Sequence, residues 1–128
     1  MKRSIFFIVS AITCFLFGVG SLLAPFEVTE QFGIVLTPET SLIVRSLGGM
    51  IFSMGVLYLL IRNQPDSALM KLVLLYSAVA HIIGLAVTIY GMASQIMLTE
   101  KLIPNLVVHL FMGVGSIFYW NKLRKLQD

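Results

Sequence analysis

Charge is scarce in this chain: Asp, Glu, Lys and Arg together make up 12% of its 128 residues, whereas hydrophobic residues make up 58%. This balance, with a mean hydropathy of +0.94, excludes an ordinary soluble globular domain. A chain of this length that is so apolar also leaves no room for a separate soluble catalytic domain. We therefore expect a small membrane protein.

Cysteine and intramembrane acid are scarce as well. The single cysteine, Cys14, lies in the first apolar run, so an internal disulfide and a CxxC redox pair are both excluded. We interpret Cys14 as a small apolar core residue. No Asp or Glu lies deep in an apolar run, which argues against an exporter that couples transport to a membrane carboxylate.

What the chain does have is four apolar runs, at about residues 4–24, 41–61, 69–93 and 104–120. Each is close to the ~20 residues that a helix needs to cross a bilayer. Because the connections between them are short, consecutive helices should be antiparallel neighbours. The predicted fold is all-α: an integral membrane antiparallel four-helix bundle (up-down-up-down) that forms one transmembrane domain over residues 1–128.

The basic residues are sorted between the two sides of this bundle. Those at the N-terminus, around the second connection and after the fourth run are Lys2, Arg3, Arg62, Lys71, Lys122, Arg124 and Lys125. The other two connections carry four glutamates and a single base, Lys101. Cytoplasmic loops are enriched in Lys and Arg, so this bias predicts that both termini are cytoplasmic.

Capping signals indicate where the helices begin and end. Pro25 should end the first helix, since proline cannot continue a helix without losing a hydrogen bond. Thr37, just before a proline, is a typical N-cap for the second helix. Asp66 or Ser67 should cap the third helix, and Pro104 should open the fourth.

Small residues indicate where helices touch, because close backbone approach permits tight packing in lipid. The predicted packing residues are Ser46, Gly49 and Ser53 in the second helix, Ser77, Ala80, His81, Gly84 and Thr88 in the third, and Gly113 and Ser116 in the fourth. Gly49 and Gly84 should therefore resist substitution. Gly18 and Gly20 lie outside such stripes and should tolerate it better.

Three polar residues suggest a ligand site. Arg45 lies about four residues inside the second run, roughly 6 Å below the outer boundary at 1.5 Å per residue. His109 lies at a similar depth in the fourth run, with Asn105 one turn above it on the same face. We predict that the three line one pocket beneath residues 26–36 of the outer connection, which should form a short interfacial helix that ends near Gly33. The alternative for Arg45 is a side chain that snorkels to the outer headgroups.

The two histidines are expected at different depths. His81 should lie roughly 16 Å from the outer boundary and His109 roughly 8 Å. Axial ligands of one haem iron need matched depths, so we expect no haem and no other cofactor. His81 is instead predicted to hydrogen-bond a neighbouring helix.

A segment around the second run carries a family resemblance. The residues Leu23-Ala24-Pro25, Phe32-Gly33 and Val44-Arg45-Ser46-Leu47-Gly48-Gly49, followed by Gly55, resemble small bacterial four-helix membrane proteins of the DoxX-like group. Within that group they are most similar to a family known only as a domain of unknown function. The resemblance implies a four-helix fold and a bacterial cytoplasmic (inner) membrane, and it implies no activity. The chain departs from the family pattern at Leu85 and near His109, where the family has an arginine and a glutamate.

Three functions stay open. The first is a non-enzymatic small membrane protein that forms an oligomer or an accessory subunit of a membrane complex, with lipids and protein as partners. The second is a binding protein or carrier for a lipid-like or quinone-like ligand. The third is a membrane enzyme that uses His81 or His109 as an acid–base group. Nucleic acid is not expected as a partner, because the basic residues flank spans and form no stripe on a soluble face.

Overall fold

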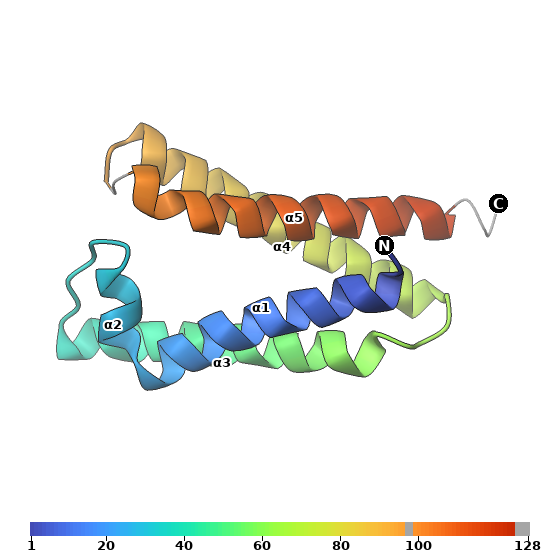
Figure 1. The fold of residues 1–128 in the computed structure, drawn as a ribbon, viewed down its shortest axis with the longest axis horizontal. Coiled ribbons are helices and arrows are strands. Elements are labelled where there is room, and N and C mark those ends of the chain that lie inside the picture. Colours follow the sequence, from blue (N-terminus) through green and yellow to red (C-terminus); the bar gives the residue numbers. More distant parts are fainter. Residues whose placement is uncertain (97–98, 125–128) are drawn as a thin grey trace. The chain divides into compact units, whose positions relative to one another are not determined.

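The computed structural model describes residues 1–96 and 99–124, and within these ranges the chain is helical with no strand. The four long helices are α1 (Arg3–Leu23), α3 (Pro38–Ile61), α4 (Ala68–Ala93) and α5 (Thr99–Arg124), and a short helix, α2 (Pro25–Glu30), follows α1 (Figure 1). Each long helix is long and apolar enough to cross a membrane. The prediction of an all-helical chain with four candidate spans is thus confirmed. Lys125, one of the bases used to predict topology, lies outside the described residues.

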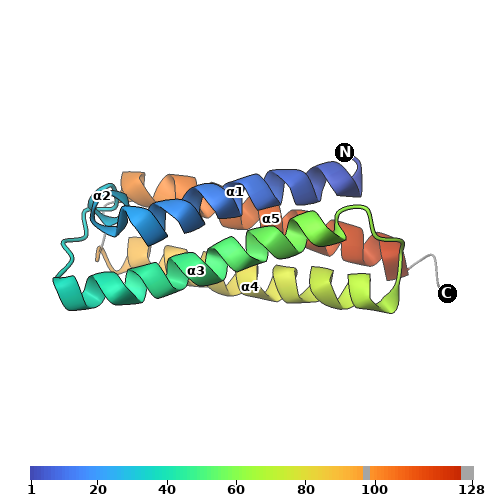
Figure 2. The same ribbon diagram turned by 90° about the horizontal axis from the view of Figure 1, so that it is seen from below.

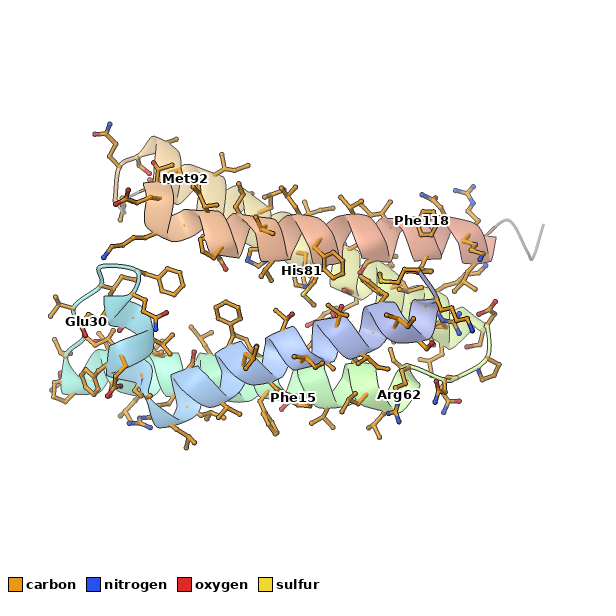
Figure 3. All side chains as sticks on the ribbon, in the orientation of Figure 1. Phe15, Glu30, Arg62, His81, Met92 and Phe118 are labelled. Atoms are coloured by element: carbon orange, nitrogen blue, oxygen red, sulfur yellow. The ribbon has the colours of Figure 1, made fainter. Side chains whose placement is uncertain are left out.

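The chain divides into two compact units, residues 1–62 and 63–128. In the first unit, α1 and α3 lie side by side in both views (Figures 1 and 2). Phe7 stacks on Tyr58 with 5.7 Å between ring centroids, and Phe15 contacts Phe52 at 5.1 Å. The residue numbers therefore rise along α1 as they fall along α3. Figure 3 labels Phe15 on α1.

Three glycines set the closest approach in this unit. A Cβ added at Gly18 would lie 2.7 Å from the backbone nitrogen of Phe52, and one at Gly48 would lie 2.9 Å from the backbone nitrogen of Leu22. At Gly55 the nearest atoms belong to Phe15 and Cys14, at 2.9 and 3.1 Å. The expectation that Gly18 tolerates substitution is therefore wrong: its lack of a side chain lets the two backbones meet.

The small-residue face predicted for the second span is not the face that meets α1. Ser46 and Ser53 are exposed, and each hydroxyl donates to the carbonyl four residues earlier. A Cβ at Gly49 would meet only the side chain of Leu22, at 3.9 Å. Gly48 and Gly55 make the close contacts instead, because neighbouring positions on a helix point about 100° apart.

The predicted helix starts are confirmed in two places and wrong in a third. Thr37 and Thr40 form a reciprocal capping box at the start of α3, and the Ser67 hydroxyl accepts from the Met70 N–H at the start of α4. The fourth long helix, however, begins at Thr99, with Pro104 inside it. Pro104 lies in the second turn, five residues after the start of α5, where its missing N–H leaves the carbonyl four residues earlier without its helical partner.

The connection after α1 contains the short helix expected there. Pro25 is the first residue of α2, where its missing N–H costs nothing. The Thr29 hydroxyl donates to the Pro25 carbonyl at 2.8 Å. Gly33, with φ of 76°, then turns the chain out of the helix, a conformation that suits glycine.

Candidate functional site: a polar seam between α4 and α5

In the second unit, the polar side chains that bond one helix to the other lie on the line where α4 meets α5, which we call the polar seam. The seam also includes the glycines on the same line, where the two helices approach closely. Its members on α4 are Ser77, His81, Gly84, Thr88 and Gly91, and those on α5 are Asn105, His109, Gly113 and Ser116. The α4 residues are spaced by four, three, four and three positions. This is the 3.5-residue period of helices that wind around each other, and it makes one continuous contact line.

At one end of the seam, two serines face each other. The Ser77 and Ser116 hydroxyl oxygens are 2.8 Å apart, and both residues are fully buried. A hydroxyl both donates and accepts, so the pair closes one hydrogen bond between the helices. In hydrocarbon the alternative would be an unsatisfied polar group. The two serines therefore tie α4 to α5.

One turn along α4, the two histidines of the chain meet. The Nδ1 atoms of His81 and His109 lie 3.0 Å apart, and the ring centroids lie 5.3 Å apart with the ring planes inclined by 51°. Both residues are half-buried. Figure 3 labels His81 on α4. The geometry is that of a direct imidazole–imidazole hydrogen bond.

Two glycines make room for these rings. A methyl group at position 84 would lie 2.6 Å from both Nδ1 and Nε2 of His109, so the His109 ring packs directly on the α4 backbone at Gly84. A Cβ at Gly113 would lie 3.4 Å from the Cβ of His81. Each histidine thus fits where the facing helix has no side chain.

A third polar contact closes the other end of the seam. The Asn105 Nδ2 donates to the Thr88 Oγ1 at 2.8 Å, and the Thr88 hydroxyl in turn donates to the Gly84 carbonyl at 2.8 Å. Thr88 is buried. This small network connects Asn105 to the backbone that supports the His109 ring.

The expected difference in depth between the two histidines is therefore wrong. The estimate counted His109 from Pro104 as the first residue of its helix, whereas α5 begins at Thr99. Five more residues place His109 about 7.5 Å deeper, which removes the difference. His81 does bond a neighbouring helix, as predicted, and its partner is the other histidine.

The 3.0 Å between the two Nδ1 atoms is a hydrogen-bonding distance and fits a shared proton. Among the described residues, no group of three or more His, Cys, Asp or Glu side chains is placed to hold a metal ion. The chemistry that this arrangement offers directly is hydrogen bonding and proton exchange.

Arg45 lies in the other unit, on α3. Its guanidinium Nη1 donates to the Leu22 carbonyl in the last turn of α1. The last carbonyls of a helix lack internal partners and carry partial negative charge, so Arg45 caps α1 from the neighbouring helix. The predicted pocket thus has Asn105 and His109 on one face of α5, four residues apart, while its convergence with Arg45 stays a prediction.

Similarity to known proteins adds nothing to this picture. No family model, curated protein or solved structure matches the chain. The resemblance to the DoxX-like group therefore stays a prediction. Function has to be argued from the side chains themselves, and in particular from what the intramembrane polar groups contact.

Proposed function

We propose that this chain is a non-enzymatic small membrane protein that assembles with further copies of itself or serves as an accessory subunit of a membrane complex. The observation that carries this proposal is where the polar side chains of the spans are directed. In the second unit they bond one another across the α4–α5 seam, and Arg45 bonds the end of α1. Their observed contacts are those that hold helices together.

The arrangement in the membrane follows from the same proposal. We place the four long helices as an antiparallel up-down-up-down bundle in the bacterial cytoplasmic (inner) membrane, with both termini in the cytoplasm. Within the pair α1–α3 and within the pair α4–α5, residue numbers rise along one helix as they fall along the other. This antiparallel pairing supports the proposed order. The bias of Lys and Arg toward the termini and the second connection supports the orientation.

The outward faces of the helices offer surface to lipid and to other subunits. Leu16 on α1, Met50 on α3 and Val87 on α4 are 72%, 71% and 65% exposed. In lipid such residues need no protein cover. The small exposed side chains of Ser46 and Ser53 would let a further helix approach closely. We therefore propose membrane lipids and a second protein chain as partners.

A second candidate function is binding of a lipid-like or quinone-like ligand at Arg45. An arginine has five N–H donors, and within the described residues Arg45 makes one hydrogen bond, to the Leu22 carbonyl. The remaining donors can bind an anionic or carbonyl-bearing headgroup with charge-assisted hydrogen bonds. Arg45 is half-buried, so such a headgroup would be held at the edge of the helix pair.

Native mass spectrometry of the protein released from membranes in a mild detergent tests both candidates. The assembly proposal predicts a mass of at least two copies, or of one copy with a second protein, that persists on dilution of the detergent. The ligand proposal predicts a bound lipid or quinone that is lost in Arg45→Gln and largely retained in Arg45→Lys. Lysine is the matched control because it keeps the charge that caps α1 and loses only the planar fork of donors.

The opposite results are equally clear. A strictly monomeric protein with no associated chain, both in native membranes after cross-linking and in detergent, would contradict the assembly proposal. A monomer that carries one defined lipid or quinone would favour the ligand-binding function instead.

A further inference from the structure

The bond between the two histidines links the protonation of one ring to that of the other. A neutral imidazole has one N–H and one lone pair. Since Nδ1 of His81 faces Nδ1 of His109 at 3.0 Å, one of these nitrogens donates and the other accepts. The two rings must therefore be opposite tautomers. As a consequence, one Nε2 carries a lone pair and the other carries an N–H.

The Nε2 atoms are the open ends of this pair. Within the described residues the bond between the two Nδ1 atoms is the only hydrogen bond of either ring, and both rings are half-buried. A polar atom left without a partner in hydrocarbon costs several kcal/mol. Both ends therefore require a small polar partner, and water is the smallest that can both donate and accept. One end of the pair offers a proton acceptor and the other a proton donor.

No charged residue of α4 or α5 lies close enough to the rings to select one tautomer over the other. In proteins the tautomer of a histidine is normally fixed by a carboxylate or backbone carbonyl at its second nitrogen. Here the charged residues nearest to the rings along the two helices are Lys71, ten positions before His81, and Lys101, eight positions before His109. At 1.5 Å per residue they are about 15 and 12 Å away. Ser77, Gly84 and Gly113, the near neighbours in the seam, carry no ionisable group.

We propose that the His81–His109 pair is a proton-transfer site that moves a proton across the α4–α5 seam, from one Nε2 to the other. A hydronium ion gives its proton to the free Nε2 and becomes water. The imidazolium that forms passes its Nδ1 proton to the Nδ1 of the second ring. The second ring then gives its Nε2 proton to water.

The step leaves both rings neutral with their tautomers exchanged, and the next transfer starts from the opposite end. One proton enters the pair and one leaves it. The original tautomers return when a proton passes in the reverse direction or when the rings rotate. This activity goes beyond the proposed role in assembly and does not depend on it.

Nitrogen-15 NMR of histidine-labelled protein in lipid bilayers tests the inference. The expected result is a coupling between the two Nδ1 atoms and, in each ring, exchange between both tautomers. His109→Asn is the decisive variant because the asparagine amide reaches the place of Nδ1 and keeps a hydrogen bond, yet it cannot take up a proton. In this variant His81 should lose its exchange and stay in one tautomer, whereas Ser77→Ala should leave the exchange unchanged.

Two outcomes would overturn the inference. One fixed tautomer per ring in the unaltered protein would reduce the pair to a structural bond. Continued tautomer exchange of His81 in His109→Asn would show that the exchange does not pass through the partner ring. Since the first measurement is made on the unaltered protein, a failure of the variant to fold does not protect the proposal.

Discussion

Gly18→Ala and Gly48→Ala should each destabilise the protein by about 1–3 kcal/mol, the usual cost of forcing an extra methyl group into a packed site. The reason is that each methyl group would meet backbone. At position 18 it would lie 2.7 Å from the Phe52 nitrogen, and at position 48 it would lie 2.9 Å from the Leu22 nitrogen. No side-chain rotation can relieve such contacts, so α1 and α3 would have to move apart.

Gly49→Ala is the matched control because it changes the same residue type at the next position of the same helix. Its methyl group would lie 3.9 Å from the Leu22 side chain, an ordinary contact. Alanine favours helix over glycine by about 0.8–1 kcal/mol, so this variant should be neutral or slightly stabilised. Reversible unfolding in mixed micelles measures all three. If Gly49→Ala were as damaging as Gly48→Ala, the register of α1 against α3 would be different from the one described.

Gly84→Ala should have a comparable effect for a different reason. The new methyl group would lie 2.6 Å from Nδ1 and Nε2 of His109, so the ring must leave its place and lose its bond to His81. We expect a loss of about 1–3 kcal/mol from overpacking, to which the broken interhelical hydrogen bond adds about 0.6 kcal/mol. Gly91→Ala, whose methyl group would lie 3.4 Å from the flexible end of Leu102, should cost little.

The double variant Gly84→Ala with His109→Ala separates this mechanism from a general loss of helix packing. Because the clash needs the His109 ring, Gly84→Ala should cost little once the ring is removed, and the two effects should be strongly non-additive. Thermal or denaturant unfolding of the single and double variants gives the coupling. Additive costs would show that Gly84 meets something other than His109.

Local signals were predictable from the sequence because they depend on a few adjacent residues. The four candidate spans follow from apolar runs of sufficient length, and the caps at Thr37 and Ser67 follow from hydroxyl residues before the first turn. The start of α5 was missed because Pro104 was taken as the first helical residue. The helix instead begins five residues before the proline, and the sequence does not distinguish the two starts.

The faces of the helices were harder to predict because they depend on the partner. In α3 the choice of Gly49 instead of Gly48 turns the predicted contact by about 100°. In α4 the 3.5-residue spacing of Ser77, His81 and Gly84 was a signal for packing residues, and all three contact α5. Read together with the corrected start of α5, it would have brought His81 and His109 to the same height.

Arg45 illustrates a contact that no local pattern reveals. Its partner is the backbone carbonyl of Leu22, 23 positions earlier in the chain. A backbone carbonyl has no sequence signature, so the sequence did not predict this contact. The arrangement follows from helix-end physics only after the two helices are known to be neighbours.

The central claim is that polar side chains inside the spans face one another along the α4–α5 seam, and a cysteine cross-link tests it most directly. Ser77→Cys and Ser116→Cys, in a Cys14→Ala background, place two thiols where hydroxyl oxygens now lie 2.8 Å apart. A second pair, Ser77→Cys with Phe118→Cys, serves as the control because Phe118 is 59% exposed on α5. Mild oxidation in native membranes should form the disulfide within single chains of the first pair and not of the second. No cross-link at 77–116, or an equal yield in both pairs, would contradict the seam.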